Sequence, residues 1–265
     1  MTTAPLWARV ALYTVANAAL AFLLLPIVSI VPASFNAASY IQLPPEAYSL
    51  RWYELFLKDT QWISSLATSM QVALACMLLS LALGMPLAIA LDRLAGPVRL
   101  AANMLILGPL IVPVIVIACA MYYAGLRAGL VGTYWGMVLG HTVLSLPFVV
   151  INVGISLRSI DPSWLKAAEG LGASPLYSFR RVLLPNIVPG VLGGAVFAFI
   201  YSFDEVVVAL FLSGIGLKTL PVRMWEIIRL EFTPVVAVAA TAMILLAAVV
   251  FLVARLVDTR RNIGP

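Results

Sequence analysis

Six long apolar stretches limit what this chain can fold into more than any other feature of its sequence. A helix needs roughly 20 apolar residues to cross about 30 Å of hydrocarbon, and each stretch reaches that length. They run approximately over Ala8–Val31, Ile63–Leu91, Leu100–Tyr123, Tyr134–Ile155, Ile187–Leu212 and Pro234–Val257. With 63% apolar and 10% charged residues, the chain has too little charge to cover a soluble globule. We therefore predict an all-α, polytopic membrane protein with six transmembrane helices.

Lysine and arginine residues are divided unevenly between the two sides of these spans. One side carries Arg9, Arg93, Arg99, Arg158, Lys166, Arg180, Arg181, Arg255, Arg260 and Arg261, and the other carries Arg51, Lys58, Arg127, Lys218, Arg223 and Arg229. Basic residues favour the cytoplasmic side of a membrane, so we expect both termini and the 156–187 loop in the cytoplasm. The net charge of +5 then reflects topology and contact with membrane lipid, and no nucleic-acid partner is expected.

A polar and basic island, Leu157–Pro189, interrupts this apolar pattern. Asp161 and Ser174 can each cap a helix, since both are followed by a proline that suits the first helical position. Gly172 tolerates the left-handed conformation that ends a helix, and Pro185 should stop or kink the second one. The sequence therefore predicts two short helices joined at glycine. The plain alternative is an ordinary hairpin between two spans.

The spacing of residues in this island resembles the cytoplasmic coupling loop of the membrane subunits of bacterial ABC importers. The pattern A-A-x3-G-x9-I-x-L-P is matched by Ala167, Ala168, Gly172, Val182, Leu184 and Pro185. The resemblance implies a type I ABC importer fold and a first short helix that sits in a groove of an ATPase subunit. It implies coupling residues at Pro162, Trp164, Leu165, Lys166, Ala167, Ala168, Glu169, Leu171, Gly172, Ala173, Val182, Leu184 and Pro185. Lys166 stands where the family motif has Glu, which removes the salt bridge expected of that Glu.

Two adjacent carboxylates, Asp204 and Glu205, fall inside the fifth predicted span. Each costs roughly 2.5–3.5 kcal/mol at a helix centre, so such residues normally face a polar cavity or a partner. Neighbouring residues on a helix point about 100° apart, so at most one should face a central pathway. We predict that Asp204 or Glu205, together with Tyr201 and Trp225, lines the outer part of a solute pathway. An interhelical salt bridge or subunit contact is the alternative role of the acids.

The run FDEVVV and the residues after it resemble the permease subunits of spermidine/putrescine importers. That resemblance implies a polyamine solute, with another small amine, an opine or a phosphonate as alternatives. It implies two ATPase subunits that carry ATP and Mg, a second homologous permease in a heterodimer or homodimer, and a periplasmic solute-binding protein. It places the chain in the bacterial inner membrane. We divide the chain into an N-terminal span and periplasmic segment (1–60), a type-1 permease domain (61–257) and a cytoplasmic tail (258–265).

The residues themselves argue against enzymatic activity. The segment Gly214–Thr219 contains a Lys-Thr pair but lacks the preceding glycine of a P-loop, so ATP should be hydrolysed elsewhere. No GxSxG motif surrounds a serine that His141 could activate, which argues against an intramembrane protease. Cys76 and Cys119 lack metal-ligand spacing, so no cofactor or metal is expected in this chain. Ion-coupled secondary transport and a purely structural membrane subunit are the alternatives from other classes.

The segment between the first two spans, Asn36–Asp59, contains an amphipathic run with Trp52, Tyr53, Leu55 and Phe56. Aromatic residues are enriched at membrane interfaces, so we expect this run to form an interfacial helix. Contact with a periplasmic partner is its alternative role.

Overall fold

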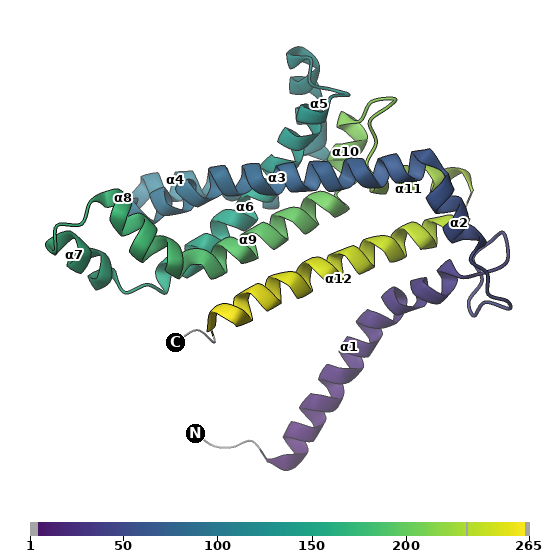
Figure 1. Ribbon diagram of the computed structural model, residues 1–265, viewed down its shortest axis with the longest axis horizontal. Coiled ribbons are helices and arrows are strands. Elements are labelled where there is room, and N and C mark those ends of the chain that lie inside the picture. The colour runs from purple at the N-terminus through teal and green to yellow at the C-terminus, as the bar shows by residue number, and fades with distance from the viewer. Residues whose placement is uncertain (1–4, 232, 263–265) are drawn as a thin grey trace. The chain divides into compact units, whose positions relative to one another are not determined.

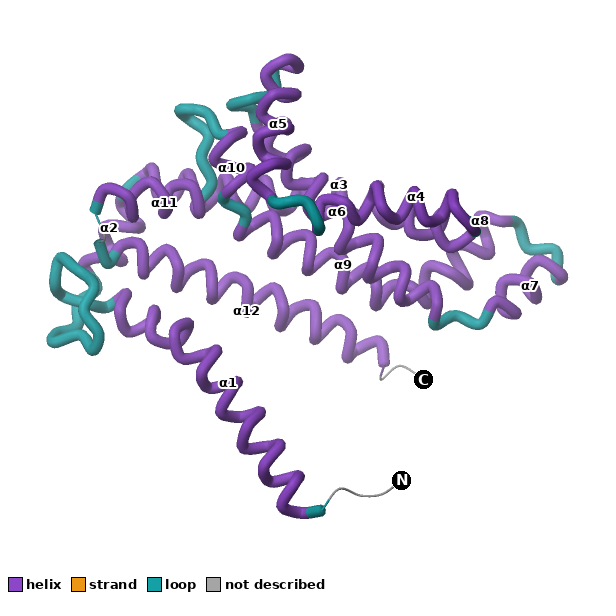
Figure 2. Tube along the Cα trace, turned by 180° about the vertical axis from the view of Figure 1, so that it is seen from behind, coloured by secondary structure: helices purple, strands orange, loops and turns teal. Residues whose placement is uncertain are grey.

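The computed structural model describes residues 5–231 and 233–262, except for the side chains of Pro162 and residues 258–262. Every regular element within these residues is helical (Figures 1 and 2). The helices are α1 (Leu6–Ser34), α2 (Arg51–Lys58), α3 (Thr60–Arg93), α4 (Gly96–Leu107), α5 (Val114–Ala128), α6 (Tyr134–Arg158), α7 (Pro162–Gly170), α8 (Pro175–Ser178), α9 (Leu184–Asp204), α10 (Val207–Leu212), α11 (Leu220–Leu230) and α12 (Val235–Asn262). A 3-10 turn, Gly108–Leu110, follows α4, and a π-helical turn, Phe179–Leu183, joins α8 to α9. The all-α prediction is confirmed.

Among the described residues, five helical segments are long and apolar enough to cross a membrane. They are Leu6–Ser34, Thr60–Arg93, Tyr134–Arg158, Pro175–Asp204 and Val235–Val257. A sixth is obtained when Gly96–Leu110 and Val114–Ala128, which meet at an angle of 98°, are counted as one broken span. The prediction of one continuous helix over the third span, Leu100–Tyr123, is therefore wrong. The two helices together are still apolar enough to form one span.

Two prolines account for the break between α4 and α5. Pro109 lies in the 3-10 turn, and Pro113 immediately precedes α5. Proline donates no backbone hydrogen bond and disfavours helical geometry in the residue before it, so two prolines four residues apart interrupt the ladder. Pro86 and Pro147 lie inside α3 and α6, which continue through them, so only the first pair interrupts a helix.

The fifth predicted span is also interrupted. The sequence favoured one helix over Ile187–Leu212, but α9 ends at Asp204 and α10 begins at Val207. Glu205 between them has an extended backbone, with φ of −68° and ψ of 123°. Because the backbone turns here, Asp204 and Glu205 do not occupy successive positions of one continuous helix.

The described residues cluster into two compact units. The first consists of the described residues within Met1–Ile63 and Glu226–Leu245, and the second of those within Ser64–Trp225 and Leu246–Pro265. In the second unit α6 packs along α9, and glycines let the two backbones approach closely. A Cβ on Gly190 would clash with the carbonyl oxygen of Asn152, and one on Gly194 would lie 3.0 Å from the Cα of Val149. This close pairing forms the centre of the second unit.

Within the second unit, the two candidate sites lie at opposite ends of α9. The α7–α8 segment follows the last turn of α6 and precedes the first turn of α9. The short helix α10 follows the other end of α9 and packs against α5 and α6 (Figures 1 and 2). The α6–α9 pair therefore connects the predicted coupling loop with the acidic residues.

In the first unit, the aromatic face of α2 packs against protein. Trp52 and Phe56 are buried, the indole N–H of Trp52 donates to the carbonyl of Ala38 at 3.2 Å, and the ring of Phe56 lies 5.6 Å from that of Trp62. The hydroxyls of Tyr53 and Ser34 are 2.7 Å apart. The expectation that Trp52 and Phe56 anchor α2 in the membrane interface is therefore wrong, because protein covers both.

Candidate functional site

The predicted coupling loop contains the two short helices that its sequence signals indicate. The Asp161 carboxylate accepts the backbone N–H of Ser163 at 2.8 Å and caps α7. Gly172 follows that helix with φ of +81°, a left-handed conformation that glycine adopts without strain. The hydroxyl of Ser174 accepts the N–H of Tyr177 at 3.3 Å and caps α8. The backbone N–H of Ser163 also lowers the pKa of Asp161, because it stabilises the ionised form.

Pro185 does not stop the chain as the sequence indicated. It lies in the first turn of α9, and the π-helical turn Phe179–Leu183 precedes it. A proline removes one backbone donor and crowds the preceding turn, and the wider π turn accommodates both effects. The helical path therefore continues from α8 through this turn into the α9 span.

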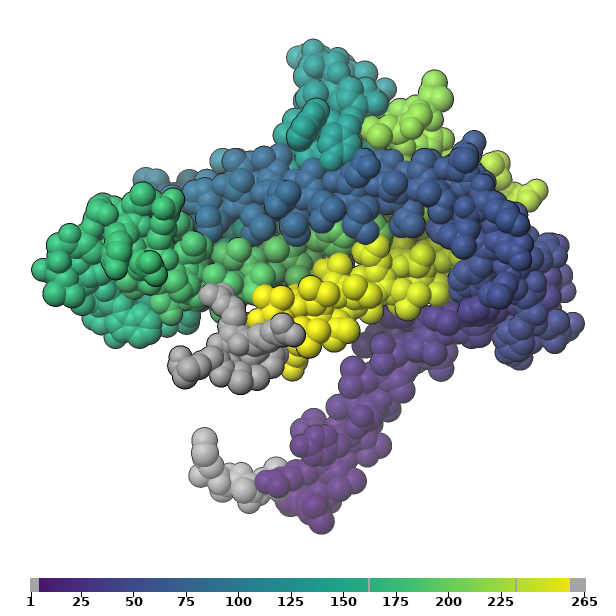
Figure 3. All heavy atoms as spheres, viewed as in Figure 1, coloured from purple at the N-terminus to yellow at the C-terminus, as the bar shows by residue number. Residues whose placement is uncertain are grey.

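The helix α7 has one face toward the protein and one toward solvent. Leu165 packs against a core cluster that includes Leu157 at the end of α6 and Leu183 at the end of the π-helical turn. On the other side, Trp164 is 51% exposed and Leu171, just after the helix, is 89% exposed. Both large apolar side chains are therefore open on the face of this segment that points away from the core. Figure 3 shows the α7–α8 region, in green, with its side chains open to the outside.

The remaining predicted coupling residues divide by exposure. The exposed ones are Lys166, Ala167, Glu169, Gly172 and Pro185, and the partly buried ones are Ala168, Ala173, Val182 and Leu184. The backbone of Pro162 begins α7, while its side chain lies outside the described part of the structure. Most of these predicted coupling residues are therefore exposed, and the others are partly buried against the core.

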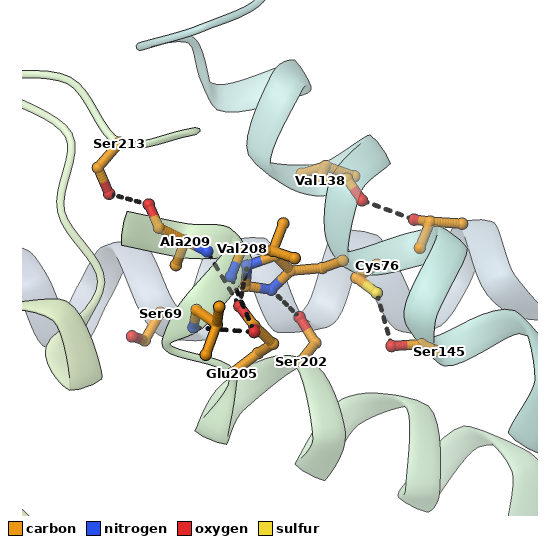
Figure 4. A network of polar contacts seen from close by, with 12 residues as sticks. Ser69, Cys76, Val138, Ser145, Ser202, Glu205, Val208, Ala209 and Ser213 are labelled. Atoms are coloured by element: carbon orange, nitrogen blue, oxygen red, sulfur yellow. Dashed lines mark hydrogen bonds and ion pairs between the residues drawn. The ribbon is translucent and has the colours of Figure 1, made fainter. Parts of the chain in front are cut away.

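The second predicted site is at the break between α9 and α10, where Glu205 acts as a helix cap. One carboxylate oxygen accepts the N–H groups of Val207 and Val208, each at 2.9 Å, and the other accepts that of Ala209 at 2.9 Å (Figure 4). The first turn of a helix leaves its N–H groups without intrahelical partners, and a carboxylate there also meets the positive end of the helix dipole. Glu205 is 8% exposed, and both of its carboxyl oxygens are engaged with the backbone of α10.

His141 lies directly beside this cap, a role that sequence reasoning missed. It is fully buried in α6, and its Nδ1 is 2.9 Å from the hydroxyl of Ser202. Its Nε2 lies 3.6 Å from a carboxylate oxygen of Glu205 and has no hydrogen-bond partner. If Ser202 donates to Nδ1, Nε2 carries the ring proton toward Glu205. The only signal in the sequence was a lone histidine in an apolar span, which does not identify its contacts.

Asp204 has a different environment from its neighbour. A cavity of about 330 Å³ is lined by Val114, Phe197, Ile200, Tyr201, Asp204, Glu205 and Val206. Asp204 is exposed, and among the described residues no hydrogen bond or ion pair engages its carboxylate. Tyr201 is partly buried, with its ring 4.9 Å from that of Phe148. The structure thus brings Tyr201, Asp204 and Glu205 to one cavity, while Trp225 does not line it.

The sequence can now be compared with known proteins. Residues 80–263 match the family described as binding-protein-dependent transport system inner membrane component. The chain belongs to this family. It is therefore the permease component of an ABC importer, a multi-pass inner-membrane subunit that does not itself hydrolyse ATP. This assignment replaces the secondary-transporter alternative.

Curated relatives cover nearly the whole permease. It is 31% identical over 242 residues to the spermidine/putrescine transport system permease protein PotC of Haemophilus influenzae, covering 91% of this chain and 94% of that one. It is 30% identical over 233 residues to the putrescine transport system permease protein PotI of Escherichia coli, covering 83% of this chain and 80% of the relative.

A solved structure supports the fold of the permease. A bacterial alginate ABC transporter, in complex with an alginate pentasaccharide-bound periplasmic protein, matches with a TM-score of 0.70. The alignment covers 96% of this chain and 94% of that chain at 16% identity. At this identity the likeness concerns the fold alone, and it confirms the expected ABC importer permease fold.

Proposed function

We propose that this permease imports a polyamine such as putrescine or spermidine. It would receive the solute from a periplasmic binding protein, pair with a second related permease, and rest on two ATPase subunits that bind ATP and Mg. Both termini and the α7–α8 loop would face the cytoplasm, as the distribution of basic residues indicates. The similarity to PotC and PotI supports the choice of solute.

The observation that carries this proposal is the unengaged carboxylate of Asp204 beside aromatic side chains in one cavity. A primary ammonium is attracted by a carboxylate and by the face of an aromatic ring, each a few ångströms away. Tyr201 and Phe197 supply the aromatic rings, and Asp204 supplies the charge. Glu205 would act by holding α10 in place, since its oxygens already accept three backbone N–H groups.

The coupling loop would transmit the motion of the ATPase subunits. The exposed Trp164 and Leu171 would enter a groove of an ATPase subunit, and Leu165 would carry its displacement to the core beside α6 and α9. A bulky residue at the partly buried Ala168, or Gly172→Pro, should therefore uncouple ATP hydrolysis from uptake. Proline cannot adopt the positive φ of Gly172. Normal uptake in both variants would argue against this coupling role.

Transport by the assembled importer in proteoliposomes, with the loaded binding protein outside, tests the solute site. A hydrogen bond to a charged group is worth about 1.5–3 kcal/mol, so Asp204→Asn should raise the KM for putrescine roughly 10- to 100-fold. Asp204→Glu keeps the charge and should retain most of the uptake. Stimulated ATPase activity should persist in both, which shows that the complex assembled.

Two results would contradict the proposal. Unchanged putrescine uptake by Asp204→Asn would remove Asp204 from the pathway. Competition by an anionic phosphonate, or by an opine, with no competition by putrescine would exclude the polyamine assignment. Competition by another small monoamine alone would favour that class of solute.

A further inference from the structure

A second cavity, with the opposite charge, lies between the ends of three helices in the second unit. It has a volume of about 220 Å³ and is lined by residues of α3, α4 and α6. Its polar lining consists of Asp92, Arg99, Asn103 and Arg158, and the rest of its wall is aliphatic or glycine, including Leu91 and Ile151. One cavity therefore offers two guanidinium groups beside a hydrocarbon wall.

The two arginines come from elements far apart in the sequence. Arg99 lies in the first turns of α4, and Arg158 is the last residue of α6. Within the described part of the chain, neither guanidinium takes part in a hydrogen bond or an ion pair. Asp92 also lines the cavity, but it is not within ion-pair distance of either arginine. Two like charges converging on one cavity without a shared partner favour an anion between them.

The N-terminus of α4 also favours an anion in this cavity. Its capping position is occupied by Ala95, which provides no side-chain hydrogen bond, and its first turn contains no acidic residue. Unfilled N–H groups at a helix start carry partial positive charge and favour anions nearby. The amide of Asn103 donates to the carbonyl of Arg99 at 2.9 Å, which ties two of the polar lining residues together.

From the helix ends we infer that this cavity lies at the level of lipid headgroups, on the side proposed above to be cytoplasmic. Arg158 ends an apolar span, and Asp92 and Arg93 end another. Basic pockets between membrane helices at the cytoplasmic surface bind the phosphates of anionic lipids. A free inorganic anion would use only the guanidinium groups, whereas a phospholipid would also cover the aliphatic wall.

We propose that this cleft binds the phosphate headgroup of an anionic phospholipid. The phosphate lies between Arg99 and Arg158, and the lipid backbone lies along the aliphatic wall. The cleft is distinct from the acidic cavity at Asp204, because its two arginines repel a cationic solute. Asp92 lowers the local positive charge and weakens lipid binding.

The test uses the whole importer complex, purified in mild detergent. Native mass spectrometry would measure retained phosphatidylglycerol after equal exposure to phosphatidylglycerol and phosphatidylcholine. Each lost guanidinium–phosphate contact should weaken binding roughly tenfold, so Arg99→Gln with Arg158→Gln should abolish the excess of the anionic lipid. Asp92→Asn should increase that excess. Arg93→Gln removes the same charge from an exposed position outside the cleft and should behave as the unchanged protein.

A thermal-shift series with inorganic phosphate distinguishes the two sources of the anion. Stabilisation by phosphatidylglycerol but not by millimolar phosphate supports the lipid. Stabilisation by phosphate alone, lost in the double variant, would replace the lipid with a free anion and overturn the proposal. Equal retention of phosphatidylglycerol by the unchanged protein and the double variant would overturn it as well. None of these readouts depends on which solute the permease carries.

Discussion

Replacing Glu205 by alanine should release the first turn of α10. The substitution removes the acceptor of three backbone N–H groups, each bound at 2.9 Å in a site where the side chain is only 8% exposed. A hydrogen bond to a charged group contributes about 1.5–3 kcal/mol, and one carboxylate divided among three donors is worth about two such bonds. The expected loss of local stability is therefore about 3–6 kcal/mol.

Hydrogen exchange of the 205–212 segment in the assembled importer measures this loss directly. If the free energy of local opening of this turn falls by about 3–6 kcal/mol, the rate of amide exchange at Val207, Val208 and Ala209 rises by about 10²–10⁴-fold. Glu205→Gln keeps one oxygen that can accept two of the N–H groups. Its amide NH2, which is a donor, would face the third N–H group and cannot accept from it. It should therefore show an intermediate increase.

The neighbouring acid provides a matched control. Asp204→Asn changes the same charge one residue away without touching a backbone N–H, so exchange in α10 should stay within about threefold of the unchanged protein. If Glu205→Ala left exchange as slow as Asp204→Asn does, the capping argument would be refuted. Equal acceleration by both acids would show that total charge, and not the cap, stabilises α10.

Three further predictions concern other residues. His141→Phe removes the contacts to Ser202 and Glu205 and should lower stability by about 1–3 kcal/mol, seen as a lower Tm, with His141→Gln less affected. Gly172→Ala meets open space but must hold φ of +81°, so it should destabilise the end of α7 by about 1–2 kcal/mol, measured by local hydrogen exchange. The lowered pKa of Asp161 means that its cap stabilises α7 above the ordinary aspartate pKa. That contribution should disappear as the pH falls below about 4, and α7 should then become more sensitive to protease. In Asp161→Asn, whose side chain does not titrate, the protease sensitivity of α7 should not change over this pH range.

The conformation of the α7–α8 segment could be predicted closely because its signals are local. Capping by Asp161 and Ser174 and the left-handed Gly172 each depend on a few neighbouring residues. Hydropathy likewise located the apolar spans, since length and composition suffice for that purpose. The π turn before Pro185 was not predictable, because a proline in a sequence does not say whether a helix ends or widens around it.

The acidic site could be predicted only in part. The sequence identified Asp204 and Glu205 as unusual, but apolar residues on both sides concealed the break that gives them different roles. The partner of Glu205 is His141, 64 residues earlier in the sequence, and this contact depends on the packing of α6 against α9. Trp225 was grouped with the acids by residue type alone, and type does not determine location.

The π-helical turn at Phe179–Leu183 also determines how far α7 and α8 are rotated about the helix axis relative to α9. A π turn corresponds to one residue inserted into a regular α-helix, and each residue turns a helix by about 100°. Deleting a single residue from this turn would restore a regular ladder into α9 but rotate the face that α8 and α7 present. A change of one residue in length would thus rotate the exposed face of α7 and α8 by about 100° without changing the sequence of α9 itself.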